Sequence, residues 1–254
     1  MHLEKNKPPR RGGIYLLPNL FTTAALFSGF YAILAAEQGR FEAAALGIFA
    51  AMVFDGFDGR IARLTNTQSD FGAEYDSLSD MVAFGVAPAL VVYNWALDGL
   101  GKVGWLAAFV YTAGAALRLA RFNTQIGVAD RRYFQGLPSP SAAAILAGAV
   151  WIVTDNALTG GYLAWLAGLL TAAAGLLMVS NFRYHSFKEL DVHGRVPFVV
   201  MVAVVLGFSL VVLDPPIVLF GLSIGYAISG PLMTLTQLRL RRDARRRERQ
   251  VGSD

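Results

Sequence analysis

Long apolar runs divide this 254-residue chain, and they constrain its fold more than any other feature. A membrane-spanning helix needs about 20 mostly apolar residues. Charged residues make up only 16% of the chain, well below the roughly 25% of ordinary soluble domains. The sequence therefore predicts an all-α integral membrane protein with eight spanning helices. The expected spans are Leu20–Ala36, Phe41–Phe54, Met81–Leu97, Val103–Leu117, Leu137–Thr154, Gly161–Phe182, Val196–Leu213 and Pro215–Leu238.

The lysines and arginines are distributed unevenly between the two sides of this arrangement. Cytoplasmic loops of membrane proteins are enriched in these residues. With the N-terminus in the cytoplasm, the cytoplasmic segments carry 20 of the 22, and the outer loops carry only Arg40 and Lys102. This asymmetry predicts that both termini are cytoplasmic. We expect one membrane-embedded domain over residues 1–240, with its core at 17–195, and a basic cytoplasmic tail over 241–254.

The basic tail raises the question of a nucleic-acid partner. Seven arginines lie between Arg239 and Arg249, and no aromatic residue lies among them. Proteins that bind single-stranded nucleic acid stack bases on aromatic side chains, whereas basic segments next to a membrane are attracted to anionic lipid. The tail therefore predicts contact with membrane lipids and no nucleic-acid partner.

Carboxylates are concentrated in one stretch, where charge beside a bilayer is costly and usually functional. Asp55 lies three residues before Asp58, so the two share a helix face. Asp76 lies four residues before Asp80, with the same consequence. The two pairs lie at the cytoplasmic ends of consecutive spans and are expected to converge. Carboxylates without His or Cys suit Mg²⁺, Mn²⁺ or Ca²⁺, and four carboxylates could hold two such ions.

The residues between these two pairs suit a phosphate ligand. Gly59 leaves the backbone open to close approach, and Arg63 follows one helical turn later, where it can pair with a pyrophosphate oxygen. Thr67 and Ser69 offer hydroxyl donors. An alternative is a solvated loop in which the acids pair with Arg60 and Arg63. Between positions 55 and 80 there are six carboxylates and only two arginines. Ion pairing with the arginines therefore leaves most of the carboxylates unexplained.

The spacing of this stretch resembles the signature of the CDP-alcohol phosphotransferase family. Written out it is D-x2-D-G-x2-A-R-x8-G-x3-D-x3-D, and every fixed position matches. The resemblance implies transfer of a phosphatidyl or related group from a CDP-linked lipid to an alcohol, with release of CMP. The matching residues are Asp55, Asp58, Gly59, Ala62, Arg63, Gly72, Asp76 and Asp80.

The resemblance also implies a role for each of these residues. Asp55, Asp58 and Asp76 would bind metal, and Asp80 would be the general base and a ligand of a second ion. Mg²⁺ or Mn²⁺ would be the productive metal, and Ca²⁺ would bind without supporting the reaction. The residues implied in binding the CDP group are Pro18, Asn19, Gly59, Ala62, Arg63, Thr67, Ser69 and Gly72.

Segments outside the signature indicate the alcohol. "RLARFN", "GLPSPSAAA" and "SNFRYHSFKELD" resemble the CDP-diacylglycerol–serine O-phosphatidyltransferases, and this likeness covers about Leu17–Arg195. It implies CDP-diacylglycerol and L-serine as substrates. It also implies a homodimer in the cell membrane, with the active site at the cytoplasmic face.

A serine acceptor brings a carboxylate, which calls for an arginine nearby. Arg118 and Arg121 lie at the cytoplasmic end of the fourth span, although both could instead be interfacial anchors. Pro138 and Ser139 could shape the pocket or simply begin a helix, since Pro is favoured in a first turn. The candidate acceptor-pocket residues are Arg118, Arg121, Asn123, Pro138 and Ser139.

Other functions compete with this interpretation. Within the family, the acceptor could be glycerol 3-phosphate or inositol phosphate, or the donor could be an archaeal lipid. A divalent-cation transporter is a more distant alternative. Transporters place their binding groups near the middle of the membrane, whereas these aspartates lie at one edge.

Overall fold

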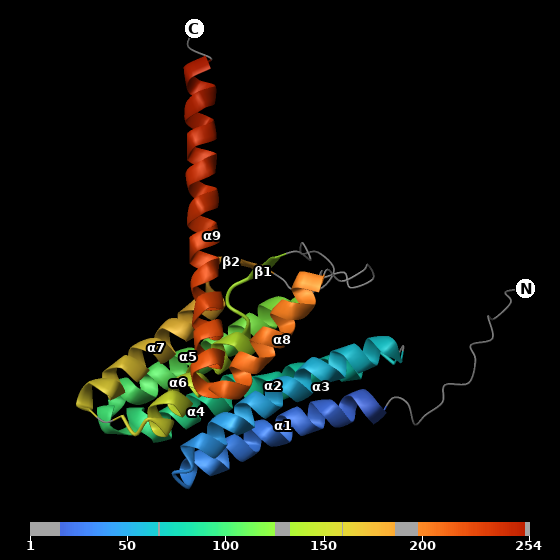
Figure 1. Ribbon diagram of the computed structural model, residues 1–254, viewed down its shortest axis with the longest axis vertical. Coiled ribbons are helices and arrows are strands. Elements are labelled where there is room, and N and C mark those ends of the chain that lie inside the picture. The colour runs from blue at the N-terminus through green and yellow to red at the C-terminus, as the bar shows by residue number, and fades with distance from the viewer. Residues whose placement is uncertain (1–15, 66, 125–132, 159, 186–197, 252–254) are drawn as a thin grey trace, which may run out of the picture.

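The protein is a bundle of long helices with one short two-stranded sheet (Figure 1). The computed structural model describes residues 16–65, 67–124, 133–158, 160–185 and 198–251. The elements are α1 (Leu16–Glu37), α2 (Phe41–Leu64), α3 (Asp70–Asp80), the π-helix η1 (Met81–Val86), α4 (Ala87–Val92), the π-helix η2 (Tyr93–Leu97), the 3₁₀-helix η3 (Asp98–Leu100), α5 (Lys102–Thr124), β1 (Tyr133–Gln135), α6 (Ser139–Asp155), α7 (Gly161–Val179), β2 (Arg183–His185), α8 (Phe198–Leu213) and α9 (Pro215–Val251).

Small residues let the helices approach closely. α1 packs along α2, α5 along α7, and α6 against both α2 and α9. A side chain at Gly114 would collide with the carbonyl of Gly175, and one at Gly175 would come within 2.7 Å of the Tyr111 Cα. Alanines such as Ala32 and Ala44 are fully buried. Small residues at helix contacts are typical of membrane proteins, because helices in lipid associate through close van der Waals packing rather than through the hydrophobic effect.

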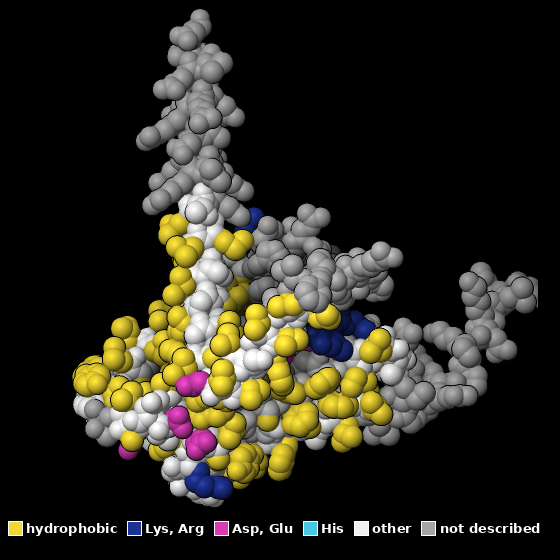
Figure 2. Space-filling view, in the orientation of Figure 1, with side chains coloured by type: hydrophobic (Ala, Val, Ile, Leu, Met, Phe, Trp, Pro, Cys, Tyr) yellow, Lys and Arg dark blue, Asp and Glu magenta, His cyan; other side chains and the backbone are white. Residues whose placement is uncertain are grey.

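The structure confirms a mainly helical protein with several helices that can cross a bilayer. Hydrophobic side chains cover most of the visible face of the bundle (Figure 2). α6 is apolar but shorter, and α2 carries the first two aspartates. Within the part of the chain that the structure describes, the helices long and apolar enough to span are Leu17–Glu37, Asp70–Leu100, Lys102–Thr124, Gly161–Val179 and Pro215–Thr236.

Several boundaries differ from those expected. α2 continues to Leu64, so the first aspartate pair lies within the helix. The expected tail is helical as far as Val251, because α9 continues through it. After Pro231 that sequence contains Leu, Arg, Gln and Glu, which favour helix. β1 and β2 pair antiparallel, an addition to the all-α expectation. Residues 1–15, the start of the seventh expected span at 196–197, and residues 252–254 lie outside the described residues.

A π-helical segment follows the second aspartate pair directly. η1 begins at Met81, immediately after Asp80. The Tyr111 hydroxyl, fully buried on α5, donates to the Phe84 carbonyl at 2.9 Å. The Thr112 hydroxyl donates to the Gly85 carbonyl at 3.4 Å. π-helical turns leave backbone groups that need other partners and often occur at functional sites. Helix α5 therefore supports the π-helical segment that directly follows Asp80.

Candidate active site

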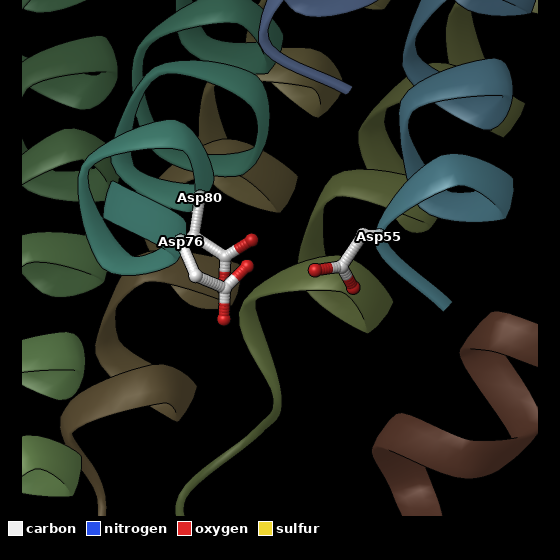
Figure 3. A group of neighbouring side chains, drawn as sticks. All are labelled: Asp55, Asp76 and Asp80. Atoms are coloured by element: carbon white, nitrogen blue, oxygen red, sulfur yellow. The ribbon is translucent and has the colours of Figure 1, made fainter. Parts of the chain in front are cut away.

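Three aspartates from two helices converge at one end of the bundle. Asp55 projects from α2, and Asp76 and Asp80 project from α3 toward it (Figure 3). One carboxylate oxygen from each lies within 4.8 Å of the others, and all three residues are partly buried. The convergence expected from the two spacings is therefore found for these three residues.

The fourth aspartate lies beside the cluster with a partner of its own. Asp58 is only 7% exposed. The Thr22 hydroxyl on α1 donates to its Oδ2 at 2.8 Å, and Asp76 lies within hydrogen-bonding range. The Ser79 hydroxyl donates to the Thr22 carbonyl at 3.1 Å, which ties α1 to α3. Sequence reasoning missed Thr22, because only the fold brings α1 to the aspartates.

The cluster suits a hard divalent cation. Asp80 has Asp55, Asp76 and Asp58 as its acidic electrostatic neighbours. Like charges held this closely repel strongly. Oxygen donors without His or Cys match the ligand preference of Mg²⁺ and Mn²⁺. Asp55, Asp76 and Asp80 could therefore hold an ion together, with Asp58 positioned to join them.

The expected CDP-binding residues on α2 include Gly59, where the backbone is exposed to an approaching ligand. A side chain added at Gly59 would meet nothing within 4 Å. The Arg63 Nε donates to the Gly59 carbonyl at 3.0 Å, and Arg63 is otherwise exposed. The Thr67 N–H donates to the Ala62 carbonyl at 3.0 Å, which folds the chain back after the helix. Packing among the described residues does not require glycine at position 59, and its open backbone would allow a ligand to approach closely.

The other expected CDP-binding residues lie where α1 meets the start of α3. Ser69 is the N-cap of α3, and its hydroxyl accepts the Gly72 N–H at 3.0 Å. A side chain at Gly72 would lie 3.1 Å from the Ser69 Oγ and 3.5 Å from the Asn19 Oδ1. The Pro18 carbonyl lies 3.2 Å from the Thr22 hydroxyl. The structure thus brings Asn19 to Gly72, one helical turn before Asp76 on α3, and Pro18 to Thr22, the residue that donates to Asp58.

Of the two candidate arginines, Arg118 interacts electrostatically with the cluster. Its guanidinium is an electrostatic neighbour of Asp80. Its Nη1 donates to the Ser139 Oγ at 2.9 Å, and Ser139 is fully buried. Its Nε is buried and has no acceptor among the residues that the structure describes. A buried donor of this kind normally has a partner, so Arg118 is well suited to receive an anionic group.

Arg121 makes different contacts from Arg118. Its Nη2 donates to the Val179 carbonyl at 3.1 Å, and its Nη1 lies 3.5 Å from the Ser180 carbonyl. These carbonyls end α7, and a cation there satisfies free acceptors and opposes the helix dipole. Asn123 exchanges hydrogen bonds with Ser77 on α3, with its Nδ2 3.0 Å from the Ser77 Oγ. These two residues join helices around the site.

Pro138 also has a structural position. It is the N-cap of α6, and its carbonyl accepts the Ala142 N–H at 3.0 Å. It fixes the first residue of that helix, Ser139, against Arg118. Pocket shaping and helix initiation, the two roles considered for this proline, are therefore compatible.

Comparison with known proteins gives the class to which this fold and site belong. The sequence model described as CDP-alcohol phosphatidyltransferase matches residues 15–179. The chain belongs to the CDP-alcohol phosphatidyltransferase family. The aspartate stretch on α2 and α3 lies inside the matching segment, and α8 and α9 lie beyond it.

Individual relatives are similar over most of the chain. A CDP-diacylglycerol–serine O-phosphatidyltransferase of Helicobacter pylori is 41% identical over 179 residues, which cover 69% of this chain and 74% of the relative. A protein of the same name from Mycobacterium tuberculosis is 31% identical over 241 residues, covering 91% and 83%. An archaetidylserine synthase of Methanothermobacter thermautotrophicus is 35% identical over 170 residues, covering 66% and 69%. The expected resemblance to the serine-using branch is confirmed.

Gly59 offers a prediction in which activity and stability change independently. Gly59→Ala should reduce CMP release at least tenfold, because the new methyl group would project where the ligand approaches. Alanine in a helix interior is favoured over glycine by about 0.5–1 kcal/mol, so the thermal stability of the variant should rise slightly. Gly56→Ala is the matched control, since a side chain there also meets nothing within 4 Å. Equal activity of the two variants would contradict a ligand at Gly59.

Proposed function

We propose that this protein transfers the phosphatidyl group of CDP-diacylglycerol to the hydroxyl of L-serine and releases CMP. The observation that carries this proposal is Arg118, a partly buried cation that interacts electrostatically with Asp80 and whose buried Nε has no acceptor among the described residues. A serine carboxylate bound to Arg118 would bring the serine hydroxyl toward Asp80. The names of the relatives support the same acceptor.

Each residue of the site has a separate role in the proposed reaction. Asp80 accepts the proton of the serine hydroxyl, since an alcohol needs a base in hydrogen-bond reach to become a good nucleophile. The serine oxygen then forms a bond to the phosphorus that carries the diacylglycerol group. The bond from that phosphorus to the CMP oxygen breaks, and CMP leaves with the electron pair. Arg63 and the open backbone at Gly59 would hold the pyrophosphate.

The aspartates would hold the metal on which this chemistry depends. Asp55, Asp58, Asp76 and Asp80 would bind two Mg²⁺ or Mn²⁺ ions, and Ca²⁺ would bind there without supporting turnover. Bound there, the metal supplies positive charge that offsets the negative charge of the pyrophosphate and of the departing CMP.

The proposal includes the arrangement in the membrane. We propose eight spans with both termini in the cytoplasm, because the lysines and arginines are concentrated in the loops on one side. Residues 1–240 would form one catalytic domain of the cell membrane, with the aspartates at its cytoplasmic face, where serine is available. A homodimer is expected from the family resemblance alone.

An archaeal lipid donor is the second candidate. The similarity to an archaetidylserine synthase favours it, and the two donors differ in their apolar tails rather than in the CDP group. The acceptor and the site residues would be the same in both cases.

CMP release by the purified protein tests the proposal. The protein is given CDP-diacylglycerol or its archaeal counterpart, Mg²⁺ or Mn²⁺, and one acceptor at a time. CMP release is expected when serine is the acceptor and not with the other acceptors. Release with glycerol 3-phosphate or inositol phosphate would overturn the acceptor and keep the family. No release with any acceptor from a folded, metal-binding protein would favour the transporter alternative.

Replacing Arg118 with lysine tests its role in binding serine, and the same replacement at Arg121 is the control. Arg118→Lys should raise the KM for serine about tenfold or more, because Lys cannot pair with a carboxylate through two parallel N–H groups. Arg121→Lys should leave that KM unchanged and lower the thermal stability, because it weakens the contact with the end of α7. Steady-state kinetics and thermal unfolding in detergent measure both. A larger serine effect at Arg121 would reverse the assignment.

A further inference from the structure

A threonine on α1 contacts both helices that carry the aspartates. Thr22 is only 3% exposed. Its hydroxyl donates to the Asp58 Oδ2 at 2.8 Å, which joins α1 to α2. Its carbonyl accepts the Ser79 hydroxyl at 3.1 Å, which joins α1 to α3 at the residue before Asp80. One residue of α1 therefore links the two halves of the aspartate site.

Asp58 depends on such a donor more than the other aspartates of the site do. It is buried, whereas the three residues of the cluster are only partly buried. A carboxylate removed from water costs free energy unless it accepts hydrogen bonds. A hydrogen bond to an ionised carboxylate is also about twice as strong as one between neutral groups. The bond from Thr22 therefore holds one oxygen of the Asp58 carboxylate in place.

The position of the Thr22 hydroxyl is set by its own helix. A hydroxyl has one hydrogen to donate, and two acceptors lie within its reach. The Asp58 Oδ2 lies at 2.8 Å, and the Pro18 carbonyl, four residues earlier on α1, lies at 3.2 Å. Because threonine is β-branched, few side-chain rotamers are open to it in a helix. The shorter distance is to the carboxylate, which is also the stronger acceptor.

The orientation of the Asp58 carboxylate decides whether this residue can join the cluster. Asp58 is not among the three aspartates whose oxygens lie within 4.8 Å of one another. Residues that hydrogen-bond to a metal ligand fix its orientation, and their replacement typically weakens metal binding by about 10–100-fold.

We infer that Thr22 is a positioning residue, whose hydroxyl orients the Asp58 carboxylate for a divalent cation held with the other three aspartates. This inference rests on the metal site of the proposed function. It adds α1, which carries none of the four aspartates, to the helices that determine the affinity for the metal.

Thr22→Val tests this inference, because valine has nearly the same shape and lacks the hydroxyl. Binding of Mn²⁺ to the purified protein without substrates is followed by electron paramagnetic resonance. The dissociation constant for Mn²⁺ should rise about tenfold or more. Thr22→Ser keeps the hydroxyl and should bind Mn²⁺ nearly as tightly as the wild type. Thr22→Ala replaces Thr22→Val if the valine variant does not fold, and the same weakening is expected of it.

Thr23→Val is the matched control. Thr23 is the next residue on α1, and its hydroxyl donates to the Asn19 carbonyl at 2.7 Å and lies 2.9 Å from the Tyr75 hydroxyl on α3. Neither contact involves an aspartate. This variant should have a lower Tm in the presence of a chelator, because a link between α1 and α3 is lost, and the same dissociation constant for Mn²⁺ as the wild type.

Three results would overturn the inference, and they differ from one another. An unchanged dissociation constant in Thr22→Val, when the wild type binds Mn²⁺, would remove Thr22 from the metal site and leave the proposed function intact. An equal weakening in Thr23→Val would assign the effect to the packing of α1 instead of the hydroxyl. Absence of Mn²⁺ binding by the wild type would overturn the proposed metal site together with this inference.

Discussion

Asp80→Asn is expected to reduce CMP release by about 10²–10⁴-fold, the range typical of losing a general base. Asparagine has nearly the same shape but cannot accept the proton of the serine hydroxyl. Because Asp80 is also a neighbour of the other three aspartates, the loss can include weaker metal binding. CMP release at saturating Mg²⁺ separates the two effects, since excess metal restores occupancy but not the base.

Asp70→Asn is the control for this variant. Asp70 is exposed at the start of α3, outside the three-residue cluster. It should retain wild-type activity and lose a little stability, because an acid in the first helical turn is favourable. Near-normal turnover by Asp80→Asn at saturating Mg²⁺ would remove Asp80 from the role of base.

Asp76→Asn is expected to abolish activity while stabilising the protein in the absence of metal. Two unit charges about 4 Å apart repel by about 4 kcal/mol at an effective dielectric constant of about 20. Neutralising one of the clustered carboxylates relieves part of that repulsion, so the metal-free variant should have a higher Tm than the metal-free wild type. Added Mg²⁺ should raise the Tm of the wild type more, because a ligand that binds only the folded state stabilises it.

Thermal unfolding in detergent with a chelator and then with increasing Mg²⁺ measures both effects. Glu74→Gln is the matched control, since Glu74 is exposed on the same helix, and it should show the full Mg²⁺ response. An equal Mg²⁺ response in Asp76→Asn and the wild type would argue against a metal site at this cluster.

The convergence of the aspartates could be predicted because it depends on local geometry. Spacings of three and four residues put side chains on one face of a helix, and a short connection makes neighbouring helices antiparallel. Asp55, Asp76 and Asp80 meet as this reasoning requires. The helix capping by Ser69 could also have been anticipated, since Ser is a preferred N-cap and Asp70 follows it.

The contacts made between distant segments could not be predicted. Thr22 reaches Asp58 from α1, and Tyr184 on β2 reaches the Ala227 carbonyl on α9. Neither residue carries a local signal, because its role depends on which helices become neighbours. The same limit applies to the two arginines. Arg118 and Arg121 lie within one turn of each other, and only the fold, which brings the first residue of α6 and the end of α7 to α5, gives them different partners.

The π-helical segment after Asp80 was also not visible in the sequence. Its residues, "MVAFGV", read as ordinary apolar helix. The hydroxyls of Tyr111 and Thr112 support it from α5. Such a segment depends on partners that lie far away along the chain.

The central claim is that the serine hydroxyl attacks the phosphatidyl phosphorus at the aspartate site. Serine labelled with ¹⁸O in its hydroxyl tests this most directly, with the purified protein, CDP-diacylglycerol and Mg²⁺. The account predicts a labelled phosphatidylserine, formed in equal amount to CMP, with ¹⁸O in the phosphodiester and none in CMP. CMP released without a labelled lipid product, or a lipid product that has lost the label, would contradict it.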